Sequence, residues 1–454
     1  MSPWSSASKI YGSAWNREDI TCLFSDHERT KSWLEILATL AEVQGKYNVI
    51  PASDAKVITQ TCRSIEVDDQ FISELTDGYS VSGHSTVGLI KAVQKRCSGD
   101  SGEWFYFGAT VQDISDTWMM LVLKTARNIF MSDLDQLDTI LSKLSLDHRD
   151  TVMAGRTHGQ QGLPITFGFK TASWLVEIRR HKTRLVEQAD RANIGQLSGG
   201  VGSLSSLGPR GLEIQAEFFN RLGLNQPDMS WTVSRDVVVE WCHLMTLISG
   251  TADRIGHEIY NLQKSETGEL CEGQADGTIG SITMPHKTNP ERSEHLGTLS
   301  RIVRANTAII DESLTHDHER DGRSWKLEWH SLPEITISTG KILQLLFDLL
   351  DGLIVNPERM RSNLEASDGR ILSESIMLAL SKKMGKQSAH ALVFEIAMKC
   401  VDEERSFKKT IMVHPGINEI LSNEQLLTLF DYSEQTGLCR ELVDRVVGGK
   451  NDNS

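Results

Sequence analysis

The stretch that decides the fold is WCHLMTLISGTADRIGHEIYNL, residues 241–262. Its apolar residues recur at alternating steps of four and three, at Trp241, Met245, Ile248, Ala252, Ile255, Ile259 and Leu262. This spacing, held over about three heptads, is typical of one long helix with a continuous apolar face. The stretch therefore predicts a helix that packs along its whole length in a bundle.

Two further stretches carry the same signal. One apolar seam runs from Met119 to Leu144 with one irregular step, and another begins after Pro164 and runs through Leu175, Ile178 and Leu185 towards Ile194. Helices of roughly 25–35 residues exceed the globular mean of about 11–12. We therefore expect an all-α protein built on a long central bundle. Faces this apolar are expected to meet partner subunits as well as each other.

Shorter elements flank the expected bundle. Strand signals are weak, because no run of alternating β-branched residues is bounded by turns. Short helices are expected at residues 33–47, 85–97, 370–383, 388–402, 423–429 and 439–447. We expect three domains, namely an N-terminal helical domain (1–110), a long-helix bundle (111–355) and a C-terminal helical domain (356–454).

Composition narrows the function classes. The formal charge is −14, from 47 Lys and Arg against 61 Asp and Glu, so no general electrostatic footprint for nucleic acid or an anionic membrane exists. No stretch approaches the ~20 apolar residues of a membrane helix, and the N-terminus lacks a signal-peptide pattern. The seven Cys are scattered without a CxxC pair, which fits a reducing compartment. We expect a soluble cytoplasmic protein without nucleic-acid or membrane partners.

The polar segment GELCEGQADGTIGSITMPHKTNPERSEH, residues 268–295, is the richest in reactive side chains. Asn289-Pro290 predicts the start of a helix. Ser281, Lys287 and Asn289 then precede a helix N-terminus, where free N–H groups favour negative charge. Ser281 could serve there as a nucleophile or a base. The alternative is an exposed lid in which Ser281 is only a turn residue, and composition alone favours that alternative.

Two other segments offer polar groups beside expected helices. In MAGRTHGQQGLPITFG, residues 153–168, His158 precedes a turn and a helix expected from near Pro164, and such a histidine can act as a general acid or base. In FGATVQDISDT, residues 107–117, Asp113 and Asp116 are expected to cap the next helix. We expect no metal site, because no HExxH occurs and His316 and His318 do not share a helix face.

Three motifs in a fixed order carry a resemblance to a known family. Gly280–Asn289, GSITMPHKTN, matches the signature GSSxMPxKxN with Ile282 in place of the second Ser. Thr157-His158 matches the TH segment, and Gly108–Asp113 matches GxTxxD. Over roughly residues 15–450 the chain resembles the fumarase/aspartase superfamily, which includes argininosuccinate lyase and adenylosuccinate lyase. The resemblance implies a homotetramer whose active sites combine three subunits.

Within that superfamily, the chain is most similar to the 3-carboxy-cis,cis-muconate cycloisomerase and adenylosuccinate lyase branch. The segments GRTHGQQGLPITFGFK (155–170) and ERDGRSWKLEWHSLPE (319–334) favour this branch. Adenylosuccinate lyases tend to hold the nucleotide phosphate with Ser and Arg where this chain has Trp325, Lys326 and Trp329. Tyr106 also replaces a pocket His of related lyases, and His84 comes from a neighbouring family segment. These departures indicate a substrate different from those of the related lyases.

The resemblance implies a shared mechanism without a cofactor. A base removes a proton α to a carboxylate, and the β-substituent then leaves the resulting aci-carboxylate carbanion. By the match, Ser281 is the base, His158 is the general acid, and Lys287 and Asn289 stabilise the developing charge. The candidate carboxylate binders are Thr110, Thr157, Gln160, Arg235 and Arg320, with His84 and Tyr106 completing the pocket. For Arg235, a salt bridge with Asp236 or Glu240 at a helix start is an equally supported alternative.

The expected protein is an enzyme, a lyase or cycloisomerase acting on a small polycarboxylate. The best single expectation is a 3-carboxy-cis,cis-muconate cycloisomerase-like activity. The alternatives are a fumarate-releasing C–N lyase for a succinyl amine or nitrosuccinate, and a decarboxylase of an aconitate-like acid. A structural protein on this fold ranks lower, because Ser281 and His158 are both present.

Overall fold

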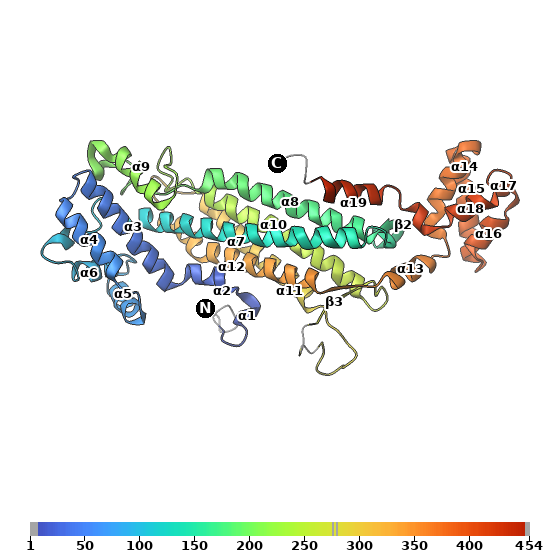
Figure 1. Ribbon diagram of the computed structural model, residues 1–454, viewed down its shortest axis with the longest axis horizontal. Coiled ribbons are helices and arrows are strands. Elements are labelled where there is room, and N and C mark those ends of the chain that lie inside the picture. The colour runs from blue at the N-terminus through green and yellow to red at the C-terminus, as the bar shows by residue number, and fades with distance from the viewer. Residues whose placement is uncertain (1–7, 275–276, 278–279, 450–454) are drawn as a thin grey trace. The chain divides into compact units, whose positions relative to one another are not determined.

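A computed structural model of the chain describes residues 8–274, 277 and 280–449. Helices make up most of the described residues, as Figure 1 shows. The α-helices are α1 (Gly12–Trp15), α2 (Glu18–Thr21), α3 (Asp26–Lys46), α4 (Ala52–Ser64), α5 (Asp69–Ser82), α6 (Val87–Gln94), α7 (Val111–Asp147), α8 (Phe167–Ala192), α9 (Gly211–Leu222), α10 (Asp236–Gln263), α11 (Glu291–Asp311), α12 (Gly322–Asp351), α13 (Pro357–Glu365), α14 (Ser373–Met384), α15 (Lys386–Asp402), α16 (Phe407–Val413), α17 (Pro415–Asn418), α18 (Asn423–Leu429) and α19 (Cys439–Gly448). The strands are β1 (Val152–Thr157), β2 (Gln160–Thr166), β3 (Leu270–Glu272) and β4 (Leu353–Val355).

The long-helix prediction is confirmed. Helix α10 has 28 residues, and every residue of its predicted seam is at most 3% exposed. Helix α7 has 37 residues, and its seam is fully buried from Leu123 to Leu141, whereas Met119 and Leu144 at its ends are only half-buried. The heptad spacing therefore located the apolar faces of both helices, and the all-α expectation holds.

The strand prediction misses two short antiparallel pairs. Strands β1 and β2 form a hairpin in which Met153 faces Ile165 and Thr157 faces Gln160, and β3 pairs with β4. Pro164, expected near a helix start, lies inside β2, so α8 begins three residues later at Phe167. A two-stranded sheet has two edges, and Pro is tolerated on an edge strand because its missing N–H faces away from the partner.

The chain forms two compact units. The first comprises residues 1–133, 181–250 and 298–344, and the second comprises residues 134–180, 251–297 and 345–454. The three-domain division stays a proposal, although its limits at 110/111 and 355/356 coincide with the start of α7 and the end of β4.

Aromatic packing holds the helices of the first unit together. Phe130 of α7 stacks on Trp241 of α10, with ring centroids 5.9 Å apart and both side chains fully buried. The buried Trp241 Nε1–H donates to Thr336 Oγ1 of α12 at 3.1 Å. The stacked rings and the hydrogen bond of Trp241 therefore join three helices at a single point.

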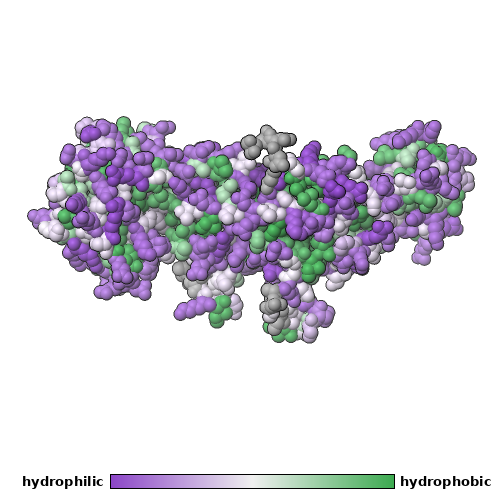
Figure 2. All heavy atoms as spheres, in the orientation of Figure 1, coloured by the Kyte–Doolittle hydropathy of each residue, from purple (hydrophilic) through white to green (hydrophobic). Residues whose placement is uncertain are grey.

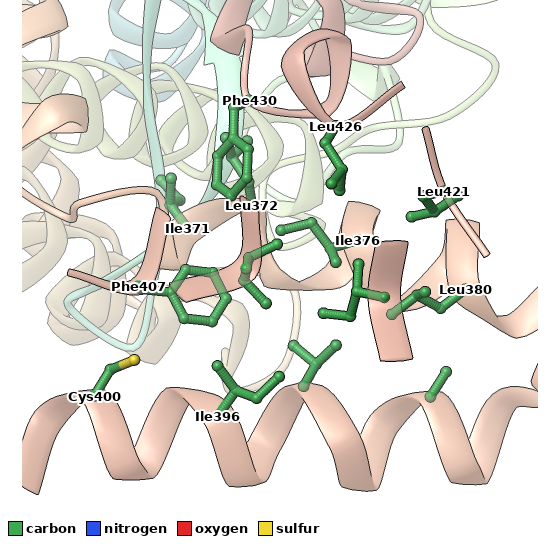
Figure 3. Close-up of a cluster of buried hydrophobic side chains, with 14 of the residues drawn as sticks. Ile371, Leu372, Ile376, Leu380, Ile396, Cys400, Phe407, Leu421, Leu426 and Phe430 are labelled. Carbon is green, nitrogen blue, oxygen red and sulfur yellow. The ribbon is translucent and has the colours of Figure 1, made fainter. Parts of the chain in front are cut away.

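The second unit contains a separate apolar core near the C-terminus. Figure 3 shows side chains of α14, α15, α16 and α18 converging, among them Ile376, Ile396, Phe407 and Leu426. Phe407 and Leu426 are fully buried, and Cys400 closes one side as a free thiol. Capping supports these short helices, because Ser422 and Gln425 form a reciprocal capping box at the start of α18.

The surface in Figure 2 is mainly hydrophilic, with separate hydrophobic patches. Within the described residues, no helix combines the length and the apolar character needed to cross a membrane.

The C-terminal core gives a matched test of these packing assignments. Phe407→Ala removes a fully buried ring, whereas Phe394→Ala removes a ring that is 58% exposed on α15. We expect Phe407→Ala to lower the opening free energy of the α14–α16 amides by about 3–5 kcal/mol in hydrogen exchange. Phe394→Ala should change it by less than about 0.5 kcal/mol. Equal effects of the two variants would contradict this core.

Candidate active site

His158 lies at the tip of the β1–β2 hairpin. The connecting residues His158 and Gly159 both have positive φ, 53° and 76°, as a type I′ turn requires. Gly adopts this conformation without strain, and His is among the few other residues enriched there. Thr157, His158 and Gln160 are all exposed at this tip. Three predicted site residues therefore project together from one turn.

A buried ion pair anchors the base of this hairpin. Arg156 of β1 donates from both terminal nitrogens to Glu269, over 2.9 and 2.6 Å, and the Glu269 side chain has no exposed surface. Asn363 Nδ2 of α13 also donates to Glu269, at 2.7 Å. Such bidentate pairing fixes orientation as well as distance. The hairpin is thereby fixed to the strand β3, which leads into the Ser281 loop.

The loop 280–290 folds tightly on itself. A Cβ atom added at Gly280 would lie 2.7 Å from the Lys287 carbonyl oxygen, so this approach requires glycine. The Ser281 Oγ accepts a hydrogen bond from the Met284 N–H at 3.1 Å. This donor favours a negatively charged Ser281 oxygen over a neutral one. Ile282 is 91% exposed, and Lys287 is exposed as well.

The N-terminus of α11 departs from the expected arrangement. We expected Asn289-Pro290 to begin a helix whose free amides face Ser281. The helix begins at Glu291, and Glu272 of β3 accepts from the N–H groups of Arg292 and Ser293 at 3.0 and 2.8 Å. A buried carboxylate thus occupies the positive end of the helix. These two N–H groups are therefore not free to face Ser281, whose oxygen accepts from the Met284 amide instead.

In the first unit, Asp113 clamps two loops together. Its side chain is buried and accepts from the N–H groups of Thr110, Ser198 and Gly199 at 3.0, 2.8 and 3.1 Å. The contact with Thr110 confirms the predicted helix cap for Asp113, whereas Asp116, also expected as a cap, lies inside α7 and binds Arg235. The other two contacts of Asp113 add a loop about 85 residues away. Burial raises the pKa of Asp113 to about 6, although the three N–H groups and Arg320 oppose that rise.

Arg320 completes a polar corner, hereafter the Thr110 corner, formed by Thr110, Asp113, Ser198, Gly199 and Arg320. Arg320 Nη1 donates to Thr110 Oγ1 at 2.8 Å, and Nη2 donates to the Gly199 carbonyl at 3.3 Å. Its buried Nε has no hydrogen-bond partner in the described residues, and its hydrogen bonds go to neutral acceptors, while its charge also acts on the nearby Asp113. A guanidinium with neutral acceptors and spare N–H donors suits a carboxylate ligand.

Tyr106 and His84 lie on neighbouring segments of the same unit. Tyr106 has a positive φ of 68°, and burial raises the pKa of its hydroxyl. That hydroxyl is buried without a hydrogen-bond partner in the described part of the chain. His84 is exposed, and its Nδ1 lies 3.1 Å from the buried Thr86 hydroxyl. The Tyr106 hydroxyl is enclosed, whereas the His84 ring is open to a ligand.

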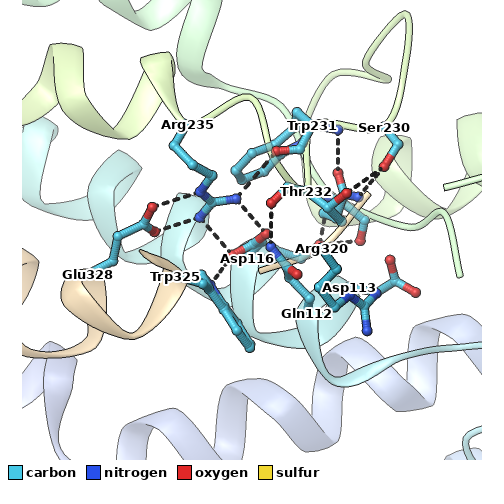
Figure 4. A network of polar contacts seen from close by, with 12 residues as sticks. Gln112, Asp113, Asp116, Ser230, Trp231, Thr232, Arg235, Arg320, Trp325 and Glu328 are labelled. Carbon is cyan, nitrogen blue, oxygen red and sulfur yellow. Dashed lines mark hydrogen bonds and ion pairs between the residues drawn. The ribbon is translucent and has the colours of Figure 1, made fainter. Parts of the chain in front are cut away.

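Arg235 occupies a different position from the one predicted. Figure 4 shows its guanidinium between Asp116 of α7 and Glu328 of α12, with Trp325 beside them. Its Nε, Nη1 and Nη2 atoms donate to the two carboxylates over 2.6–3.0 Å. Its Nη1 also donates to the Trp231 carbonyl over 3.4 Å. Burial disfavours its charge, but the two carboxylates outweigh burial and raise its pKa.

The partners of Arg235 are thus neither Asp236 nor Glu240, the alternatives that the sequence suggested. Arg235 is about 98% buried, and all of its donors face acceptors of its own unit. We therefore leave Arg235 out of the proposed substrate ligands. Its two carboxylate partners lie 119 and 93 residues away in the chain, so local spacing gave no signal for them.

Eight of the eleven predicted site residues thus fall into three groups. Thr110 and Arg320 lie together, Thr157, His158 and Gln160 share the hairpin tip, and Ser281, Lys287 and Asn289 share the loop 280–290. Sequence reasoning missed the roles of Glu269 and Glu272, which hold the hairpin and α11. Within the described residues, no group of three or more His, Cys, Asp or Glu is arranged to hold a metal ion.

The sequence of this chain matches two family models and several known proteins. Residues 10–304 match the family described as Lyase, and residues 369–446 match the family described as Adenylosuccinate lyase C-terminus. The N-acetyl-S-(2-succino)cysteine lyase of Enterococcus italicus is 39% identical over 429 residues, covering 94% of this chain and 93% of that protein. The protein of the same name from Dickeya dadantii is 37% identical over 438 residues, covering 96% of each.

A solved structure shows the same fold. The 3-carboxy-cis,cis-muconate lactonizing enzyme from Pseudomonas putida superposes with a TM-score of 0.89 at 28% identity, covering 97% of this chain and 98% of that one. The chain therefore belongs to the fumarase/aspartase superfamily of lyases, as its three motifs predicted. It is an enzyme of the carbanion-type elimination class.

The two arginines give a matched test of this site. Arg235→Met leaves two buried carboxylates without a counter-charge, so we expect a loss of about 3–5 kcal/mol in unfolding free energy. Arg320→Met removes a guanidinium that bonds only neutral acceptors, so stability should change little. Its kcat/KM should fall about 100-fold through loss of a carboxylate ligand. Urea unfolding and steady-state kinetics measure both, and the reverse pattern would contradict the two roles.

Proposed function

We propose that this member of the superfamily releases fumarate from a 2-succino thioether by β-elimination. The observation that carries the proposal is the Thr110 corner, where Arg320 donates to a hydroxyl and a carbonyl and has no carboxylate as a hydrogen-bond partner in the described residues. A dicarboxylate such as a succinyl group supplies that partner. The thioether is favoured because two relatives at 37–39% identity over nearly the whole chain are N-acetyl-S-(2-succino)cysteine lyases.

The proposed reaction breaks one C–H bond and one C–S bond. The Ser281 oxygen takes a proton from the methylene carbon of the succinyl group, and the electron pair enters the adjacent carboxylate. The pair then returns to form the C=C bond of fumarate while sulfur leaves with the C–S electrons. His158 gives its proton to that sulfur, so the products are fumarate and a free thiol. No oxidant, reductant or cofactor takes part.

Electrostatics would supply most of the catalysis. The carbanion intermediate places additional negative charge on a carboxylate, and preorganised donors can contribute roughly 3–4 kcal/mol each at such a position. Lys287 and Asn289 are the proposed donors, and the Met284 amide already faces the Ser281 oxygen. Thr110, Thr157, Gln160 and Arg320 are proposed to hold the substrate carboxylates.

We propose further that these groups meet in a homotetramer. The hairpin tip with His158 is exposed, and so are Ile282 and Lys287 on the Ser281 loop. Catalytic side chains on exposed tips remain open to water unless another surface covers them, and water weakens every charge interaction of the mechanism. A second copy of the chain is the covering surface that closed symmetry provides.

A cycloisomerase activity is the second candidate. The observation that favours it is the likeness to the muconate lactonizing enzyme, with a TM-score of 0.89. The two candidates share the carbanion and differ in product, since one gives fumarate and the other a lactone. A substrate panel therefore separates them.

Proton NMR provides the direct test. We expect N-acetyl-S-(2-succino)cysteine to give fumarate and N-acetylcysteine, while 3-carboxy-cis,cis-muconate gives little lactone. Ser281→Ala should lower kcat by about 1,000-fold or more, because the proposed base is gone. Thr283→Ala on the same exposed loop serves as the control and should retain activity.

Lactone as the main product would favour the cycloisomerase instead. Fumarate formation undiminished in Ser281→Ala would contradict the assignment of the base.

A further inference from the structure

Two stems hold the loop that carries Ser281. The entry stem, residues 270–273, is the strand β3 with the glycine after it, and the exit stem, residues 287–290, leads into α11. Gly280 lies directly against the exit stem, because a Cβ atom added to it would be only 3.1 Å from the Thr288 Cα. The position of Ser281, the next residue, therefore depends on where Thr288 is held.

Gln263, the last residue of α10, contacts both stems with one side-chain amide. Its Oε1 accepts from the Glu272 N–H of the entry stem at 2.8 Å, and its Nε2 donates to the Thr288 carbonyl of the exit stem at 3.2 Å. An amide suits this position because it has an acceptor oxygen on one side and donor hydrogens on the other. The reversed amide would face a donor with a donor and an acceptor with an acceptor, so the two contacts also fix its orientation.

The entry stem has further supports of its own. It pairs with β4, and the Glu272 carboxylate accepts from the N–H groups of Arg292 and Ser293 at the start of α11. These contacts fix β3 and the first turn of the helix to each other. The Thr288 carbonyl lies between them in the chain and receives its side-chain hydrogen bond from Gln263. Gln263 therefore ties the exit stem to a part of the unit that is already fixed.

The two hydrogen bonds of Gln263 differ in their access to water. The bond to the Glu272 N–H is half-buried, whereas the bond to the Thr288 carbonyl is exposed. Water can replace the lost donor at an exposed carbonyl, so removal of this bond leaves no unsatisfied buried group. A water molecule does not join Thr288 to the entry stem, however. The amide of Gln263 therefore contributes more to the position of the exit stem than to the stability of the fold.

We propose that Gln263 is a positioning residue for the Ser281 base and acts through Thr288 and Gly280. This inference rests on the proposed function, because it takes Ser281 as the base. Reacting atoms must lie about 3–3.5 Å apart, and a displacement of about 1 Å can lower a rate about 100-fold. Loss of the amide should therefore lower kcat, while KM, which depends on the carboxylate binders, should change little.

Gln263→Met tests this role, because it keeps the length of the side chain and removes both hydrogen bonds. We expect kcat for N-acetyl-S-(2-succino)cysteine to fall about 30-fold, with KM changed by less than about threefold. Gln435→Met is the matched control, since Gln435 also donates from Nε2 to a threonine carbonyl, that of Thr428, at 3.2 Å. It lies after α18, far along the chain from the Ser281 loop, and should leave kcat and KM within about twofold of the native values. Both variants should keep a cooperative urea transition.

Gln263→Glu tests the donor of the amide by itself. A protonated carboxyl group donates through its O–H and accepts through its other oxygen, whereas a carboxylate only accepts. The ordinary pKa of Glu is about 4.3, and a facing carbonyl such as that of Thr288 raises it by favouring the protonated form. The kcat of Gln263→Glu, divided by the native kcat at the same pH, should therefore rise at least about fivefold between about pH 8 and about pH 5. The same ratio for Gln263→Met should stay level.

The outcomes separate this inference from the proposed function. A native kcat in Gln263→Met, an equal loss in Gln435→Met, a loss mainly in KM, or no acid recovery in Gln263→Glu overturns the role of Gln263 and leaves the lyase standing. If the native enzyme releases no fumarate, the proposed function fails. Hydrogen exchange of the Met284 amide, which donates to Ser281 Oγ, then tests Gln263 without substrate. Exchange at least about tenfold faster in Gln263→Met than in Gln435→Met supports the role, and equal rates overturn it.

Discussion

The buried contact of Arg235 with Asp116 and Glu328 is the interaction on which the first unit depends. It joins the beginnings of α7, α10 and α12 at one point that water does not reach. Buried charges are costly unless they are paired and their hydrogen bonds are satisfied, and here every donor of the guanidinium has an acceptor. The arrangement therefore allows one register of the three helices. The Thr110 corner uses the same segments, at the start of α7 and just before α12.

Two arginines in one unit differ in the partners that hold them. Arg235 is saturated by carboxylates, whereas Arg320 contacts only a hydroxyl and a carbonyl. Asp113 fixes the loops around Arg320 through backbone amides, so the guanidinium is held without being neutralised by a direct ion pair. Preorganisation of this kind places a charge before the substrate arrives, which is what stabilisation of a carbanion requires.

Sequence periodicity predicted the long helices well, because a seam such as 241–262 encodes its buried face in local spacing. The hairpin 152–166 escaped prediction, since its strands lack a run of alternating β-branched residues and its turn uses His-Gly rather than a typical hairpin pair. The three motifs located the candidate site residues. They gave no indication of Arg235's partners, because contacts across about 100 residues of chain follow from helix packing rather than from spacing. For the same reason, the capping of α11 by Glu272 was missed.

The central claim is that one fumarate-releasing site draws its carboxylate-binding corner and its base from different copies of the chain. The most direct measurement mixes two inactive variants, Arg320→Met and Ser281→Ala, after joint dissociation and reassembly. Random mixing should restore about a quarter of the native kcat for N-acetyl-S-(2-succino)cysteine, because a quarter of the sites then receive both intact residues. Activity no higher than that of the separate variants, in a sample shown to contain mixed oligomers, would contradict the account.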